Sequence, residues 1–183
     1  MGQMIELKAE DGHSFSAYLA EPSGKARGAI VVVQEIFGVN NHIQRTADGF
    51  AADGYVAIAP AFFDRVQRGV NLGYAPADIE TGRAFIPKMN MDQAMLDVAA
   101  AVKRVQGAGK VGIVGYCWGG TVSWVAAAKA PVTCAVAYYG GGVGANMGLK
   151  PRVPVMFHWG ETDHAIPIDT VVRPVEAAHP SEP

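Results

Sequence analysis

Two short stretches near the start of the chain alternate apolar and polar residues, which is the pattern of a strand with one buried face. They cover residues 5–8 and 15–20 and flank the dipeptide Asp11-Gly12. Because such a dipeptide favours a tight turn, the two stretches predict an antiparallel β-hairpin at the edge of a sheet.

The pattern then changes to continuous apolar runs that are rich in β-branched residues. Such runs are typical of strands buried on both faces of a parallel sheet, and segments with helical spacing separate them. The strand segments are 29–33, 55–59, 110–114, 133–139 and 153–159, and the helical segments are 41–52, 91–105, 120–129 and 169–178. This alternation predicts an α/β fold with a mostly parallel, doubly wound sheet.

One long segment, residues 62–90, shows neither pattern. It contains Tyr74, Arg83 and Phe85. We expect it to form an irregular cap over the carboxyl ends of the strands, where open α/β sheets bind their ligands. No linker or internal repeat interrupts the pattern, so residues 1–183 are predicted to form a single domain.

Composition narrows the choice of function. The chain has 15 Lys and Arg against 17 Asp and Glu, and half of its residues are hydrophobic. A core can therefore form, and the lack of a basic run predicts no nucleic-acid partner and no membrane partner. With no bilayer-spanning apolar stretch and no signal pattern, we predict a soluble, cytoplasmic protein. The two cysteines lack the spacing of a disulfide framework or a zinc site.

The motif with the clearest chemistry is Gly115-Tyr116-Cys117-Trp118-Gly119-Gly120, which lies between a predicted strand and a predicted helix. This is the context of a nucleophile elbow, with Cys in place of the commoner Ser. The helix N-terminus favours a thiolate at Cys117. The alternative is a buried structural cysteine. Cys134 has no glycine bracket, so we expect it to lie in the core and to be inert, and Cys117 to be the reactive thiol.

Glu35 follows the first buried strand, which places its carboxylate at the ligand-binding edge of the sheet. It could orient or deprotonate the Cys117 thiol, and the alternative is a solvated residue at a strand end. The backbone amides of Ile36 and Trp118 are placed in chain order to form an oxyanion hole.

Asp163 lies in the loop that follows the last predicted strand. An acid at this point suits the orienting member of a triad in the chain order nucleophile, acid, histidine. Glu161 competes for that role, and either carboxylate could instead cap the helix that follows.

Four motifs in this order resemble the dienelactone hydrolase (carboxymethylenebutenolidase) family, which has the α/β-hydrolase fold. They are residues 34–40 (QEIFGVN), 115–120 (GYCWGG), 138–140 (YYG) and 163–167 (DHAIP). The resemblance implies hydrolysis of a small ester or lactone by a Cys–His–Asp triad, with Cys117 as nucleophile, Asp163 as orienting acid and Glu35 as a partner that helps to ionise the thiol. It implies no cofactor.

Two further residues are candidates for substrate binding. Tyr138 belongs to one of these motifs, and Arg83 could bind a substrate carboxylate, although a solvated arginine is the simpler interpretation. A metal site is not expected, because His158, Asp163 and His164 lack a ligand spacing. Two glycine-rich stretches, 107–112 and 140–145, lack the strand-then-helix context of a dinucleotide site.

The triad histidine is where the sequence departs from the family. There it follows one more strand after the acid, and this chain reaches His179 where that strand should begin. His164 is the immediate neighbour of Asp163 and would need an unusual turn, and His179 ends a helix that runs away from the site. His42 and His158 are most simply structural. We therefore expect an α/β-hydrolase-like domain without its last strand and helix.

Two functional hypotheses remain open from the sequence. The first is a cysteine hydrolase of an ester or lactone. The second is a catalytically impaired or truncated domain that binds small esters, carboxylates or a partner without turnover. The substrate and the oligomeric state are not predicted.

Overall fold

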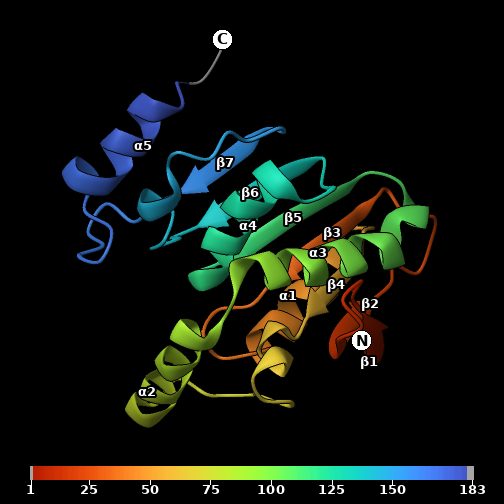
Figure 1. Cartoon of the computed structure of the whole chain (residues 1–183). Helices are drawn as coiled ribbons and strands as arrows, with labels where there is room; N and C mark the ends of the chain where they lie inside the picture. The colour runs from red at the N-terminus through yellow and green to blue at the C-terminus, as the bar shows by residue number, and fades with distance from the viewer. Residues whose placement is uncertain (1, 181–183) are drawn as a thin grey trace.

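The structure is a computed structural model that describes residues 2–180. Its centre is a seven-stranded sheet in the order β1-β2-β4-β3-β5-β6-β7 (Figure 1). The β1–β2 and β2–β4 pairs are antiparallel and the other pairs are parallel. The N-terminal hairpin and the mostly parallel sheet confirm the sequence prediction. The strands are β1 Gln3–Lys8, β2 Ser14–Ala20, β3 Ala29–Val33, β4 Val56–Pro60, β5 Val111–Tyr116, β6 Cys134–Tyr138 and β7 Val155–His158.

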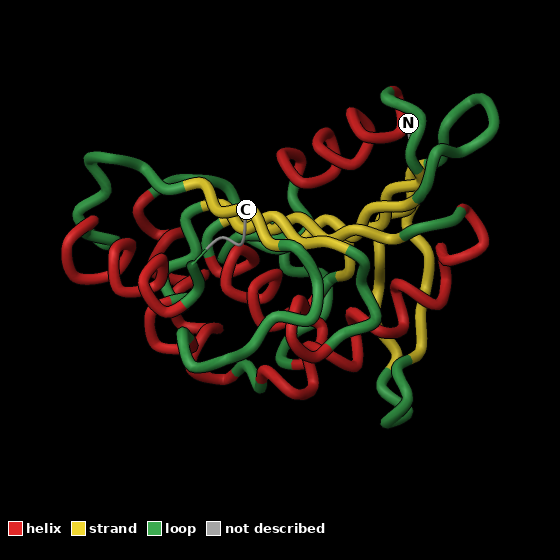
Figure 2. The backbone as a smooth tube through the Cα atoms, turned by 90° about the horizontal axis from the view of Figure 1, so that it is seen from above, coloured by secondary structure: helices red, strands yellow, loops and turns green. Residues whose placement is uncertain are grey.

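Helices cover the two faces of the sheet unequally. On one face α1 packs against a smaller apolar cluster, and on the other face α3, α4 and α5 contribute to the larger cluster. Figure 2 shows this arrangement, with one helix above the sheet and most of the others below it. The helices are α1 Asn41–Ala52, α2 Pro76–Phe85, α3 Met91–Val105, α4 Trp118–Lys129 and α5 Arg173–Ala178. None of the helices in residues 2–180 has the length and apolar character needed to cross a bilayer.

The elements with strong periodicity agree closely with the sequence prediction. The strand at 29–33 and the helices at 41–52 and 91–105 have the predicted bounds. The helix predicted from residue 120 starts at Trp118, directly after the cysteine turn. The helix predicted at 169–178 is a π-helical turn, Ile168–Val172, followed by the short α5.

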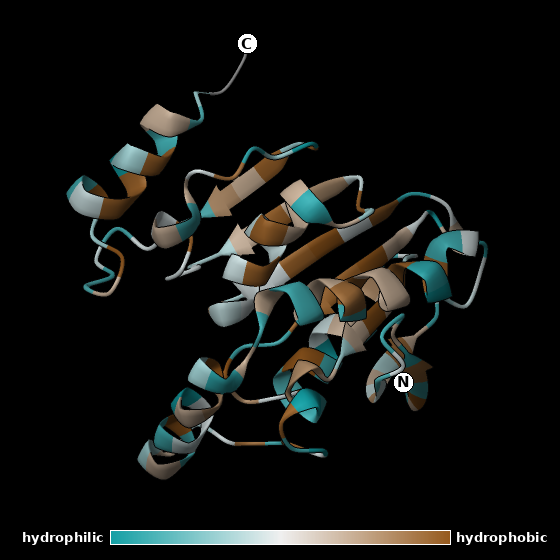
Figure 3. Cartoon of the chain, viewed as in Figure 1, coloured by the Kyte–Doolittle hydropathy of each residue, from teal (hydrophilic) through white to brown (hydrophobic). Residues whose placement is uncertain are grey.

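The prediction that residues 62–90 are irregular was wrong. They contain α2 and the 3₁₀ turns Phe62–Arg65 and Ile86–Lys88. Helix α2 starts because Pro76 stands in its first turn and the Asp78 carboxylate accepts a hydrogen bond from the Ala75 amide. Its apolar and polar residues are mixed, whereas the central strands are mostly apolar (Figure 3). That weak periodicity explains why the sequence did not reveal the helix.

The prediction that Cys134 lies in the core was also wrong. Cys134 is the first residue of β6 and its side chain is exposed. It lies on the same face of the strand as Val136 and Tyr138, which is the α1 face. Helix α1 leaves the β6–β7 end of that face uncovered within residues 2–180 (Figure 2). Burial on both faces, which the continuous apolar run suggested, therefore fails at this edge.

The exposure of Cys134 reverses the expected order of cysteine labelling. Iodoacetamide at neutral pH is expected to alkylate Cys134 faster than Cys117, because the Cys134 thiol is accessible and Cys117 is half-buried with a raised pKa. Peptide mass spectrometry of the folded protein over time measures both rates. Labelling of Cys117 before Cys134 would contradict this result.

Candidate active site

Cys117 occupies the sharp turn between β5 and α4. Its φ of 55° lies in the left-handed region, which a non-glycine residue adopts only when its surroundings hold it there. The Cys117 amide donates to the Tyr138 carbonyl at 3.0 Å, and the Gly120 amide donates to the Cys117 carbonyl at 2.9 Å. These bonds fix the turn to the neighbouring strand and to its own helix.

The glycines around Cys117 are required by close backbone packing. A Cβ on Gly115 would overlap the Gly119 carbonyl oxygen, and one on Gly119 would lie 2.5 Å from the Gln34 carbonyl oxygen. The end of β3, the end of β5 and the start of α4 therefore meet at backbone distance. This is the strand–turn–helix geometry that the motif predicted.

The pKa of the Cys117 thiol lies above its ordinary value. Burial raises the pKa of Cys117, and the negative charges of Glu35 and Asp163 raise it further. The Trp118 amide and the charge of Arg83 act in the opposite direction. Burial and two carboxylates thus oppose the preference for a thiolate that the helix N-terminus provides.

Glu35 is half-buried directly after β3. Its two carboxylate oxygens accept hydrogen bonds from two phenols, Tyr74 at 3.1 Å and Tyr139 at 3.4 Å. Tyr139 also has a left-handed φ, of 39°, and burial followed by the charges of Glu35 and Cys117 raises its pKa. The sequence assigned no role to these two tyrosines.

The two amides predicted to form an oxyanion hole lie in neighbouring turns. Ile36 follows β3 and Trp118 follows β5, and these strands pair in parallel with Val33 opposite Gly115. Among residues 2–180, the Ile36 amide donates no hydrogen bond to the protein. It is therefore free to donate to a ligand.

Asp163 is half-buried in the loop after β7. Its negative charge contributes to the raised pKa of Cys117. Its carboxylate accepts a hydrogen bond from the Ala165 amide at 2.9 Å, so it also caps a turn of its own loop. The competing acid, Glu161, is exposed, and so is Arg83 on α2.

The histidines that follow Asp163 in the chain make contacts outside the candidate site or are exposed. The His179 ring lies 5.0 Å from the Trp124 ring, and its Nε2 lies 2.6 Å from the Met147 carbonyl oxygen. His164 is exposed in its loop. Within the described residues 2–180, no imidazole forms a hydrogen bond with Cys117 or Asp163.

Tyr138 is part of an aromatic stack across three strands. Its ring stacks on His158 at 4.2 Å and on Tyr116 at 5.1 Å, and His42 meets Tyr116 edge-on at 5.8 Å. The faces of the Tyr138 ring are thus largely used within the fold. Its role in binding substrate stays a prediction.

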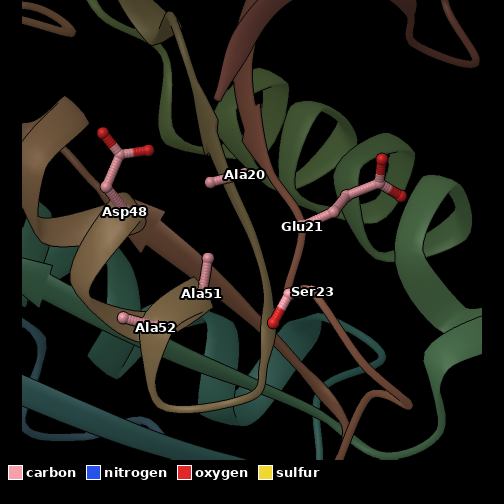
Figure 4. A pocket seen from close by; sticks show the side chains of 6 residues that line it. All are labelled: Ala20, Glu21, Ser23, Asp48, Ala51 and Ala52. Atoms are coloured by element: carbon pink, nitrogen blue, oxygen red, sulfur yellow. The ribbon is translucent and has the colours of Figure 1, made fainter. Parts of the chain in front are cut away.

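A pocket of about 220 Å³ between the end of β2 and α1 lies away from these residues. Figure 4 shows its lining, with the Glu21 and Asp48 carboxylates on opposite sides. Asp48 already accepts hydrogen bonds from the Tyr18 hydroxyl and the Gly2 amide. Across residues 2–180, His, Cys, Asp and Glu side chains form no group of three that could hold a metal ion.

Comparison with known proteins points to one family. Residues 15–179 match the model of the dienelactone hydrolase family. A carboxymethylenebutenolidase of Pseudomonas putida is 36% identical over 173 residues, which cover 89% of this chain and 72% of that protein. Carboxymethylenebutenolidase 1 of Cupriavidus pinatubonensis is 29% identical over 169 residues, covering 88% and 72%.

A solved structure shows the same fold. A Klebsiella pneumoniae protein assigned to the dienelactone hydrolases superposes with a TM-score of 0.77 at 29% identity, and the match covers 96% of this chain and 80% of that one.

Proposed function

This chain belongs to the dienelactone hydrolase family, and from that premise we propose that it hydrolyses a carboxylic ester or lactone through the thiol of Cys117. One observation carries the proposal: the half-buried Cys117 stands at a strained turn between β5 and α4, and the negative charge of Glu35 contributes to its raised pKa. Nucleophiles of acyl-transfer enzymes are held in this way.

The first half of the proposed reaction transfers the acyl group to sulfur. The Ile36 and Trp118 amides bind the carbonyl oxygen of the substrate, where negative charge develops. Glu35 accepts the Cys117 proton as the sulfur attacks the acyl carbon. Collapse of the tetrahedral intermediate breaks the carbon–oxygen bond, and the leaving alkoxide takes the proton from Glu35.

The second half returns the thiol. Water attacks the thioester, the carboxylic acid leaves, and sulfur regains a proton. Asp163 is the proposed orienting acid of the site, and its half-buried position supports that role. Arg83 is the proposed partner of a substrate carboxylate, since its positive charge already acts on Cys117.

Trapping the acyl-enzyme tests the proposal directly. After brief reaction of the Cys134→Ser variant with p-nitrophenyl acetate and acid quenching, we expect one acetyl group, on the peptide that contains Cys117. Release of p-nitrophenol with the acetyl group on any other residue would overturn Cys117 as the nucleophile.

A further inference from the structure

Helix α2 presses its backbone against the turn that follows β3. Gly82 is buried in α2, and a Cβ at this position would overlap the Ile36 carbonyl oxygen and lie 3.1 Å from the Ile36 carbonyl carbon. A real Cβ does not approach backbone so closely. Only glycine therefore lets α2 lie directly on Ile36, the residue whose amide donates no hydrogen bond within residues 2–180.

The segment before α2 holds the same turn at three more points. The Leu72 amide donates to the Phe37 carbonyl at 2.9 Å, and Gly38 forms an antiparallel bridge with Asn71. The Phe37 ring meets the Tyr74 ring edge-on at 4.6 Å. The segment that leads into α2 therefore contacts the turn after β3 at several successive residues.

Gln34 contacts the turn after β3 from the protein interior. Its side chain is fully buried, and its Nε2 donates to the Glu35 carbonyl at 3.4 Å, whereas its Oε1 has no partner among residues 2–180. The Glu35 carbonyl and the Ile36 N–H are the two ends of one peptide group. A donor on that carbonyl therefore also fixes the direction of the Ile36 N–H.

We propose that Gly82 and Gln34 are positioning residues that hold the Glu35–Ile36 peptide with its N–H toward the reacting carbonyl. The inference rests on the proposed function and goes beyond it, since it gives α2 a role in setting the oxyanion site. An oxyanion donor acts only when it is already in place as charge develops. Gly82 lies against the Ile36 carbonyl and Gln34 donates to the Glu35 carbonyl, so both act through the backbone at Ile36.

Two reactions of Cys117 can distinguish positioning of the Ile36 N–H from a general effect on the structure. Acylation by p-nitrophenyl acetate forms a tetrahedral oxyanion, whereas alkylation by iodoacetamide displaces iodide and forms none. In a Cys134→Ser background, Gly82→Ala is expected to slow acylation about 10- to 100-fold and to leave the alkylation rate unchanged. Alanine favours helix more than glycine does, so α2 itself should persist.

Gly49→Ala is the matched control. Gly49 also lies in a helix, α1, but a Cβ there would meet nothing within 4 Å. Both reactions of this variant are expected to match the parent protein. Gln34→Met is the second test: it removes the donor to the Glu35 carbonyl together with the unpartnered Oε1, so acylation should fall while the melting temperature stays equal or rises.

The outcomes separate cleanly. An equal loss of acylation and alkylation in Gly82→Ala, or unchanged acylation in both variants, would overturn the positioning role. Alkylation of Cys117 without acylation in the parent protein, by any aryl ester or lactone tried, would instead overturn the proposed hydrolysis and this inference with it.

Discussion

Replacing Cys117 by alanine is expected to reduce ester hydrolysis by about 10³-fold or more, to the small rate that bound amides alone provide. The thiol is the proposed group that forms a covalent bond with the acyl carbon, so no thioester can form without it. Initial rates with p-nitrophenyl acetate, corrected for the uncatalysed reaction, measure the loss.

The second cysteine provides the control for this variant. Cys134 is exposed at the start of β6, on the uncovered end of the sheet, and Cys134→Ala should retain the parent rate. Equal melting temperatures of the two variants would show that each is folded. Hydrolysis by Cys117→Ala at the parent rate would exclude a cysteine mechanism.

The sequence predicted those parts of the fold and the site that depend on local patterns. The β3 and β5 strands are continuous apolar runs, and the turn at Cys117 follows from glycines that sit within three residues of it. Chain order alone also placed Glu35 and Ile36 after β3, at the carboxyl edge of the sheet. Each of these features is encoded by near neighbours in the chain.

Features that depend on distant segments were not predictable in the same way. The phenols that bind Glu35 come from residues 39 and 104 positions away in the chain. The sequence does not distinguish Gly82 from other glycines, because it lies in a helix with weak hydrophobic periodicity. Its close packing against the Ile36 backbone is visible only in the structure. Exposure of Cys134 likewise depends on which helices cover β6, which the strand pattern does not encode.

The protonation state of Cys117 required the structure as well. A helix N-terminus favours a thiolate, but the effect is modest at a half-buried group. Burial is the largest influence on this thiol, and two carboxylates add to it. The pKa of Cys117 therefore lies above its ordinary value, and the thiol needs a proton acceptor in order to attack.

Glu35→Gln is expected to change the two reactions of Cys117 in opposite directions. The negative charge of Glu35 contributes to the raised pKa of Cys117, so its removal lowers that pKa. In a Cys134→Ser background, the pH at which iodoacetamide alkylation reaches half of its maximal rate should therefore fall. Ester hydrolysis at neutral pH should nevertheless drop about 100-fold, because the proton acceptor is lost.

Burial decides between these two effects. Since burial remains the largest cause of the raised pKa after Glu35→Gln, most of Cys117 stays protonated at neutral pH and the lost acceptor dominates. The glutamine oxygen can still accept from the Tyr74 or Tyr139 phenol, so the local geometry should persist. Glu10→Gln, in the exposed hairpin turn, serves as the control for removal of one negative charge. Hydrolysis that rises with the thiolate fraction in Glu35→Gln would show that Glu35 only suppresses ionisation and is not the base.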